Sequence, residues 1–265
     1  MDLKLAGKVA LITGGSRGIG LRTARLFAEE GCHVGICGRT AADVEAAGAE
    51  LRAKGVRVTA LPADVTVAAE AAMFVERCAA ELGRIDILVN NVGGSTGGLT
   101  VMETTDDDWQ RTLGFNTFQA VRMIRLAVPH LRRQGGGAIV NLASISGWHP
   151  QLAGTPQYGA SKAATIFLTE RLALELVHDN IRVNTVSPGS ITWDGGDWDS
   201  YRKANPEGYA TYVREGFPMG RLGAPEEVGE VVVFLASPRA HWINGRHIPV
   251  DGLEQPVPAP DYKPW

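Results

Sequence analysis

Short runs of Val, Ile and Leu alternate with longer stretches of helical periodicity along almost the whole chain. This alternation is typical of βαβ units, which build a parallel sheet covered by helices on both faces. Seven strands are expected, at Val9–Thr13, His33–Cys37, Arg57–Leu61, Ile85–Asn90, Ala138–Leu142, Arg182–Val186 and Arg246–Val250. Helices are expected between them, at Gly18–Glu30, Ala41–Lys54, Val67–Leu82, Asp106–Arg133, Gln157–His178 and Pro225–Ala236. The sequence therefore predicts an α/β, single-domain, Rossmann-type three-layer fold with a seven-stranded parallel sheet.

Two regions interrupt this rhythm. Residues 190–223 form a polar stretch far longer than an ordinary strand-to-helix connection, and we interpret it as a substrate lid within a catalytic domain of residues 1–253. Its many aromatic residues predict either a pocket with aromatic walls or simple packing of the lid onto the domain. The tail, residues 254–265, carries four prolines and is expected to lie extended on a surface.

Composition narrows the class of protein further. A chain of 265 residues, 45% of them hydrophobic, is long enough for one domain with a large core. The net charge of -3 is spread along the chain, without a basic block that would bind nucleic acid. No apolar run is long enough to span a bilayer, and the first residues lack a signal-peptide core. We expect a cytoplasmic protein with neither nucleic acid nor membrane as a partner.

The three cysteines, Cys32, Cys37 and Cys78, form no C-x-x-C pair and suit buried, reduced thiols better than a disulfide framework. The six histidines include no H-E-x-x-H pattern. We expect no metal site.

A glycine-rich turn follows the first predicted strand, with the sequence Thr13-Gly14-Gly15-Ser16-Arg17-Gly18-Ile19-Gly20. Its glycines allow a tight turn and a close approach to a pyrophosphate, while the next helix offers unpaired N–H groups to the anion. A glycine-rich turn alone is weak evidence, but its place between a strand and a helix is the context that the motif requires. The turn predicts a dinucleotide site.

The spacing G-x-x-x-G-x-G resembles that of the short-chain dehydrogenase/reductase family, and the resemblance extends over nearly the whole chain. Asn90-Asn91-Val92-Gly93 resembles the family's N-N-A-G motif, and Asp64-Val65 resembles its adenine-contacting pair. The resemblance implies an oxidoreductase with a nicotinamide dinucleotide as cofactor. The cofactor-binding residues implied in this half are Gly14, Ser16, Arg17, Gly18, Ile19, Gly20, Asp64, Val65, Asn91 and Gly93.

The choice of dinucleotide is read at the end of the second strand, where an acidic residue would bind the 2′-hydroxyl of NAD. Here the sequence is Gly38-Arg39-Thr40, which has no carboxylate, and Arg39 with Arg17 could flank a 2′-phosphate. We therefore predict NADP(H), with Arg39 and Thr40 among the cofactor-binding residues. If Arg39 is only a solvated surface charge, the alternative is NAD(H) in an alcohol or polyol dehydrogenase.

Tyr158 and Lys162 are four residues apart near the start of a predicted helix, and hence on one face of it. A neighbouring ammonium stabilises a phenolate, so we expect Lys162 to lower the pKa of Tyr158. Tyr158 could then donate a proton to a carbonyl oxygen, or remove one from an alcohol, as general acid or base. These two residues match the family's Y-x-x-x-K motif, which implies that Lys162 also contacts the cofactor.

Two more positions resemble the family's catalytic set. Ser144 resembles the serine that binds the substrate oxygen, and Asn116 resembles the asparagine that holds a proton-relay water. The distance from Ser144 to Tyr158 is one residue longer than is common, which makes Ser146 a rival. Ser144 is preferred because Gly147 keeps the family's spacing after it, so the extra residue falls in the loop around residues 150–156.

Pro188-Gly189-Ser190-Ile191 resembles the family's turn beside the nicotinamide, which implies cofactor contacts from Pro188, Gly189, Ile191 and Thr192. A threonine is common where this chain has Trp193, so the hydroxyl that meets the cofactor is left open. The last strand resembles the family's subunit interface and implies a homotetramer. The sequence thus predicts hydride transfer between NADP(H) and a small carbonyl or secondary alcohol substrate. A dinucleotide-sensing module without turnover is the alternative outside enzymes.

Overall fold

The sheet in the computed structural model, which describes residues 2–151, 154–259 and 261–262, has the seven parallel strands that the sequence predicts. Their spatial order is β3-β2-β1-β4-β5-β6-β7, and every neighbouring pair is parallel. The strands are β1 (Val9–Thr13), β2 (His33–Gly38), β3 (Val58–Pro62), β4 (Ile87–Asn90), β5 (Gly137–Leu142), β6 (Ile181–Pro188) and β7 (His247–Val250). All residues of β1 and β4 are buried, as continuous apolar runs at the centre of a two-sided sheet require.

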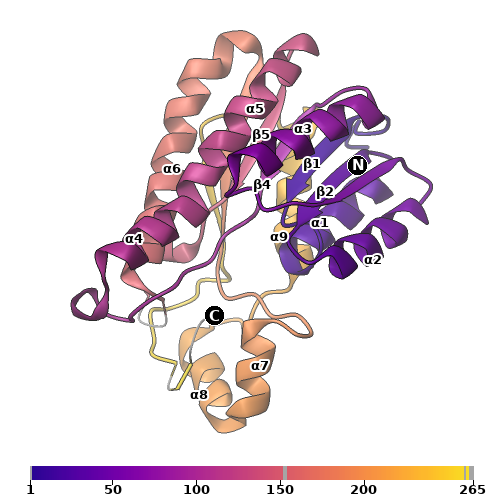
Figure 1. Cartoon of the computed structure of the whole chain (residues 1–265). Coiled ribbons are helices and arrows are strands. Elements are labelled where there is room, and N and C mark those ends of the chain that lie inside the picture. Colours follow the sequence, from indigo (N-terminus) through magenta and orange to yellow (C-terminus); the bar gives the residue numbers. More distant parts are fainter. Residues whose placement is uncertain (1, 152–153, 260, 263–265) are drawn as a thin grey trace.

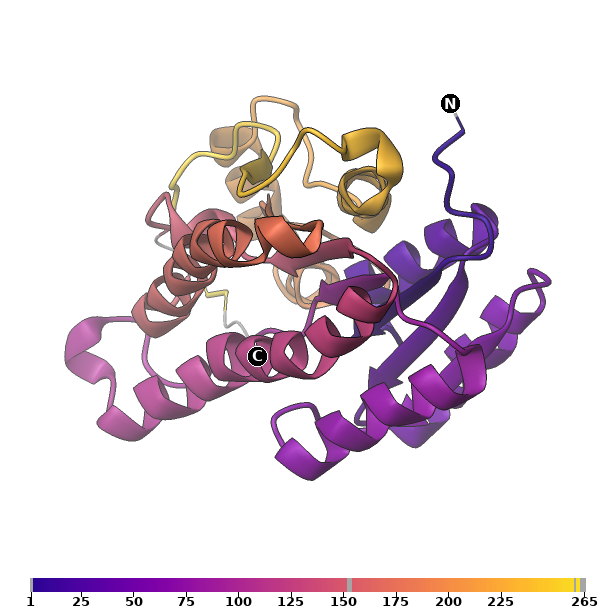
Figure 2. The same ribbon diagram turned by 90° about the horizontal axis from the view of Figure 1, so that it is seen from above.

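Helices cover both faces of the sheet and enclose two cores (Figures 1 and 2). The helices of this layered domain are α1 (Gly18–Glu29), α2 (Ala41–Arg52), α3 (Ala68–Leu82), α4 (Asp106–Leu113), α5 (Gln119–Arg133), α6 (Pro156–Leu176) and α9 (Pro225–Ala236). Phe27, Leu51 and Val232 belong to the core under α1, α2 and α9, whereas Phe74 and Met123 belong to the core under α3 and α5. The three-layer prediction is confirmed.

The predicted helix at residues 106–133 contains an irregular turn. Between α4 and α5 the chain forms a π-helical segment, Gly114–Phe118, which takes in more residues per turn than an α-helix. Such segments occur often at functional sites, and this one carries Asn116.

The lid region contains two helices that we did not predict, α7 (Asp197–Ala204) and α8 (Pro206–Gly216). They form a small unit below the sheet in Figure 1. This unit has its own apolar cluster, built around Tyr212, Phe217 and Leu222. The periodicity of so short and charged a segment is too weak to reveal such helices, which depend on packing against this cluster.

The described part of the tail has no helix and lies mostly on the surface, as expected, but it is also anchored to the lid. Glu254 is only 3% exposed, the Gln255 N–H donates to the carbonyl of Gly216 at 2.8 Å, and Val257 joins the apolar cluster of the lid. Pro260 and Pro264 lie outside the described residues. The tail and the lid therefore form one packed unit.

No helix within the described ranges combines the length and the apolar character needed to cross a membrane.

Candidate active site

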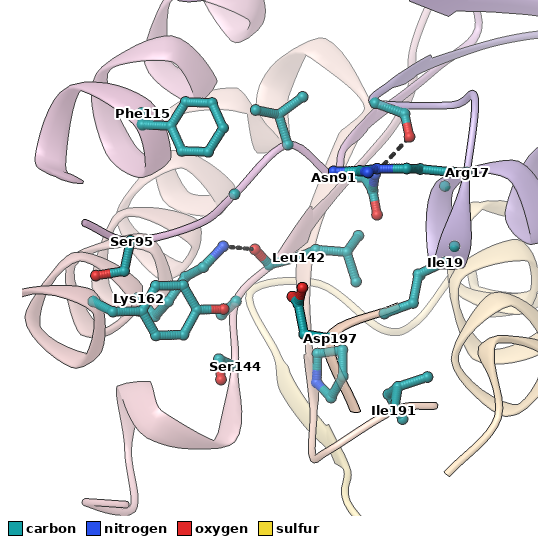
Figure 3. Close-up of a pocket in the computed structure, with 18 of the residues that line it drawn as sticks. Arg17, Ile19, Asn91, Ser95, Phe115, Leu142, Ser144, Lys162, Ile191 and Asp197 are labelled. Carbon is teal, nitrogen blue, oxygen red and sulfur yellow. Dashed lines mark hydrogen bonds between the residues drawn. The ribbon is translucent and has the colours of Figure 1, made fainter. Parts of the chain in front are cut away.

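The strand order places β1 next to β4, while the chain leaves β1 toward β2 on the other side. Ligands of open α/β sheets bind at such a switch point, beyond the carboxyl ends of the strands. A cavity of about 630 Å³ opens there, lined by residues that follow β1, β2, β4, β5 and β6 (Figure 3). The topology thus brings most of the predicted site residues to one crevice.

The glycine-rich turn has the geometry of a phosphate cradle. Gly14 and Gly18 have φ angles of 65° and 52°, which favour glycine. A Cβ on Gly20 would lie 2.2 Å from the carbonyl oxygen of Gly14, so only glycine lets α1 approach the turn this closely. Asn91 Nδ2 donates to the carbonyl of Thr13 at 2.9 Å and ties the turn to the end of β4. No side chain caps the start of α1, which leaves its first N–H groups open to an anion.

Two exposed cations line the end of the cavity that is formed by the glycine-rich turn and the residues after β2. Arg17 and Arg39 both line it, and the Arg39 guanidinium lies 5.7 Å from the centroid of the Phe115 ring. Neither arginine forms an ion pair with another described residue. Asp43, in the first turn of α2, also lines this end and is a carboxylate that the sequence analysis missed.

Lys162 and Tyr158 project from α6 into the other end of the cavity. Lys162 Nζ donates to the carbonyl oxygen of Leu142 at 2.9 Å, drawn as a dashed line in Figure 3, and lies 5.5 Å from the centroid of the Tyr158 ring. The α-helical spacing therefore brings the two side chains together as predicted. Burial lowers the pKa of Lys162 to about 8.

The prediction that the pKa of Tyr158 is lowered is wrong. Burial raises the pKa of Tyr158 to about 12, and a hydrogen bond from Ser144 offsets only part of this rise. The cost of placing a phenolate in a buried site outweighs the stabilising contacts around it. At neutral pH the Tyr158 phenol is therefore protonated.

Ser144 and its rival Ser146 both line the cavity, and Ser144 is the one that bonds Tyr158. Ser144 Oγ also accepts a hydrogen bond from the Ser146 N–H at 3.2 Å. These contacts favour Ser144 as the residue beside the reacting oxygen. Of the loop in which we placed the extra residue, residues 152 and 153 lie outside the described ranges.

Asn116 is not among the residues that line the cavity. Its Oδ1 accepts from the Gly94 N–H at 2.9 Å, and its Nδ2 donates to the carbonyls of Gly94 at 2.7 Å and Thr112 at 2.9 Å. A Cβ on Gly93 would lie 2.6 Å from Lys162 Nζ and 2.9 Å from Asn116 Oδ1, so any larger residue at position 93 would collide with both groups. The role of Asn116 in holding a water stays a prediction.

Thr192 also lies outside the cavity lining, and its N–H donates to the carbonyl of Gly223 at 2.9 Å. Trp193 lines the cavity instead. Its ring lies against Gly18, because a Cβ added to Gly18 would be only 3.1 Å from the nearest ring atoms. The lid therefore rests on the glycine-rich turn. The remaining predicted residues all line the cavity: Gly14, Ser16, Arg17, Gly18, Ile19, Gly20, Arg39, Thr40, Asp64, Val65, Asn91, Gly93, Ser144, Tyr158, Lys162, Pro188, Gly189 and Ile191.

Several lining residues were missed by sequence reasoning. Asp197, Trp198 and Tyr212 come from the lid, and Glu254 and Tyr262 come from the tail. The crowding of aromatic residues in the lid was the one available signal. No sequence pattern indicates that Glu254 and Tyr262 reach the cavity, because their place depends on how the lid folds.

Within the described ranges, no group of three or more His, Cys, Asp or Glu residues is placed to hold a metal ion. The three cysteines are free and buried, as expected, and burial raises the pKa of each thiol.

A family model described as enoyl-(acyl carrier protein) reductase matches residues 14–252, which is most of the chain. A curated relative, dehydrogenase/reductase SDR family member 4 of Oryctolagus cuniculus, is 37% identical over 250 residues, covering 94% of each chain. The chain belongs to the short-chain dehydrogenase/reductase family. Another member, the 3-oxoacyl-(acyl-carrier-protein) reductase of Thermotoga maritima, is 34% identical over 94% of this chain and 98% of its own.

Solved structures of this family agree with the fold. L-sorbose reductase from Gluconobacter frateurii, complexed with NADPH and L-sorbose, has a TM-score of 0.89 and 38% identity, over 95% of this chain and 98% of its own. A 7α-hydroxysteroid dehydrogenase complexed with NADH and 7-oxo glycochenodeoxycholic acid has a TM-score of 0.87 and 30% identity, over 97% of each chain. The chain is thus an oxidoreductase of this family, with a nicotinamide dinucleotide as its cofactor.

Proposed function

We propose that this protein is an NADP(H)-dependent reductase of ketones, with Tyr158 as the proton donor. The observation that carries the proposal is the half-buried Tyr158 phenol, hydrogen-bonded to Ser144, in a cavity whose other end is the glycine-rich turn before α1. When bound, the nicotinamide dinucleotide would supply the hydride. Ser144 would bind the carbonyl oxygen, and Tyr158 would give that oxygen its proton as negative charge develops on it.

The protonated Tyr158 phenol supplies the proton that the reductive step needs. Reduction of a carbonyl needs a proton donor, whereas oxidation of an alcohol needs the phenolate as a base. With a pKa of about 12, the phenol holds its proton at neutral pH. Lys162, with a pKa of about 8, is mostly an ammonium there and would stabilise negative charge that forms on the phenol oxygen.

Arg39 supports NADP(H) as the cofactor. It is an exposed cation at the cavity mouth without an ion-pair partner among the described residues, and a 2′-phosphate would give it one. L-sorbose reductase, which is similar to this chain, was solved with NADPH. Asp43 at the same mouth favours the second candidate, an NAD-dependent alcohol or polyol dehydrogenase, because a carboxylate would repel a 2′-phosphate.

The two cofactors are separated by measuring the dissociation constants of NADPH and NADH in the wild type and in Arg39→Ala. We expect the substitution to weaken NADPH binding by about 10- to 100-fold, the worth of a hydrogen bond to a charged group, and to leave NADH binding near the wild-type value. Arg125→Ala is the matched control, since Arg125 is exposed on α5 away from the cavity. Equal NADPH affinity in wild type and Arg39→Ala would remove the case for NADP(H).

Turnover is tested with Tyr158→Phe on a panel of ketones and alcohols. The variant should bind NADPH like the wild type but reduce ketones about 10²- to 10⁴-fold more slowly, the usual effect of losing a general acid. If the wild type binds NADPH tightly and turns over no compound of the panel, the protein is a dinucleotide-sensing module instead.

We also propose a homotetramer. Large apolar side chains are exposed on the surface of the π-helical segment and of α6, including Phe118 at 61%, Phe167 at 72% and Leu174 at 67%, and such side chains are usually covered in an assembly. Light scattering on the eluting protein measures the assembly directly, and a monomer would refute it.

A further inference from the structure

Around Tyr158, part of the cavity lining forms a surface that we call the substrate wall: Ser95, Gln151, Asp197, Trp198 and Tyr262. Trp198 stacks on Tyr262 with ring centroids 4.1 Å apart and an angle of 3° between the planes. It also stacks on Tyr212 at 4.7 Å and 8°. These contacts fix the aromatic part of the wall, which joins the lid to the tail.

The charge at this end of the cavity is negative. Among the described residues, the cations that line the whole cavity are Arg17 and Arg39 at the dinucleotide end and Lys162, which donates to Leu142. The carboxylates of Asp197 and Glu254 line the substrate end. A substrate that carries a carboxylate or a phosphate would therefore meet this negative charge, and among the described lining residues the cation at this end, Lys162, already donates to the carbonyl of Leu142.

Asp197 and Glu254 differ in what they already bind. The Glu254 carboxylate accepts hydrogen bonds from the Ser190 N–H, the Ser190 hydroxyl and the Tyr212 hydroxyl. The Asp197 carboxylate accepts no side-chain hydrogen bond and forms no ion pair with any residue that the structure describes. It lies in the first turn of α7, where the helix dipole favours negative charge, and Figure 3 shows it facing the cavity.

We propose that Asp197 determines specificity by selecting neutral ketones that carry hydroxyl groups near the carbonyl; this rests on the ketone reduction proposed above. The half-buried carboxylate accepts hydrogen bonds from substrate hydroxyls, and these charge-assisted bonds are stronger than neutral ones. The faces and edges of Trp198 and Tyr262 cover the carbon chain.

The other polar groups of the wall favour hydroxyls over an ammonium group. Gln151 presents both an amide donor and a carbonyl acceptor, and Ser95, bonded to Thr155, carries a hydroxyl that can do either. A hydroxyl can donate to Asp197 and accept from these groups. An ammonium can only donate, so it would leave their donors unused.

The test compares four-carbon ketones with saturating NADPH: erythrulose with several hydroxyls, butanone with none, acetoacetate with a carboxylate, and aminobutanone with an ammonium. Wild type, Asp197→Asn and the control Asp194→Asn are measured; Asp194 is an exposed lid residue outside the cavity lining. We expect Asp197→Asn to lower kcat/KM for erythrulose by about 10- to 100-fold, with butanone changed less than about threefold. Acetoacetate should improve, and Asp194→Asn should match the wild type on all four ketones.

The outcomes separate the two proposals. Equal losses on erythrulose and butanone, or no loss on either, would overturn the role of Asp197 while ketone reduction stands. A larger loss on aminobutanone than on erythrulose would show that the carboxylate selects a cation and would overturn the hydroxyl assignment. If the wild type reduces none of these ketones, nor the wider panel, while binding NADPH, the proposed function itself fails.

Discussion

Glu254 joins three parts of the molecule that are distant in sequence. Its carboxylate accepts from the Ser190 N–H at 2.5 Å, from the Ser190 hydroxyl at 2.9 Å and from the Tyr212 hydroxyl at 2.9 Å. Ser190 lies at the start of the lid after β6, Tyr212 lies on α8, and Glu254 itself begins the tail. Replacing it should loosen the attachment of the lid without unfolding the sheet.

The size of the effect depends on the replacement. Glu254→Ala removes the acceptor from three donors, of which the Ser190 and Tyr212 hydroxyls, 3.1 Å apart, can bond each other and leave two without a partner. A buried donor without a partner costs about 1–3 kcal/mol, so two such donors cost about 2–6 kcal/mol. Glu254→Gln keeps an oxygen for the Ser190 N–H and offers an amide N–H₂ to the two hydroxyls. Burial raises the pKa of Glu254, which means that the carboxylate is less stable here than in water. We therefore expect the glutamine variant to be at least as stable as the wild type at pH 7.

Hydrogen exchange measured by mass spectrometry reports the local stability of the lid in each variant. In Glu254→Ala the amides of α7 and α8 should exchange about 30-fold faster or more, which corresponds to about 2 kcal/mol, while β4 and β5 stay protected. Glu215→Ala, an exposed change on α8, is the control. The reasoning is refuted if the glutamine variant exchanges as fast as the alanine variant, because then the negative charge itself would hold the lid.

The raised pKa of Glu254 also determines whether this residue makes the protein more or less stable as pH rises. Over the range between its unfolded and folded pKa values, the folded protein holds a proton that the unfolded chain has lost. This contribution to wild-type stability is full below the unfolded pKa and is lost as pH rises through the folded pKa. Glu254→Gln should lack this part of the pH dependence, which urea titrations from mildly acidic to neutral pH would measure.

Gly20→Ala should abolish NADPH binding because its Cβ would lie 2.2 Å from the Gly14 carbonyl oxygen, whereas Gly55→Ala, with open space around it, should keep binding and lose only about 1 kcal/mol of stability in urea titrations. Ketone reduction should fall as pH rises through about 8, because Lys162 then loses its charge; a flat rate profile up to pH about 10 would contradict this. The three buried cysteines should resist thiol reagents in the native protein, and rapid labelling would refute their burial.

The sheet and the phosphate cradle could be predicted from sequence because both depend on local signals. The apolar runs gave the seven strands, although β6 extends two residues further than expected, to Pro188. The glycine spacing located the cradle, and the four-residue spacing placed Tyr158 and Lys162 on one face of α6. Each of these features needs only a few neighbouring residues to be recognised.

The substrate wall could not be predicted because it depends on contacts between distant segments. A glutamate such as Glu254 in a proline-rich tail is usually solvated, and its burial becomes evident only once α8 is folded against it. The pKa of Tyr158 was misjudged for a related reason: sequence shows the neighbouring Lys162 but not the depth of burial, and burial dominates. The missed features are therefore those set by tertiary packing.

The wider turn at Gly114–Phe118 has a consequence for how this helix can vary. Each residue of an α-helix advances the direction of its side chain by about 100°. Deleting one residue from the turn would make the helix regular but would rotate α4 by about that angle relative to α5. Asn116 would then face away from Gly94. The helix would then be more regular and intrinsically more stable, but Asn116 would no longer hold the loop of Gly93 and Gly94 beside Lys162. This stretch should therefore tolerate no change in length.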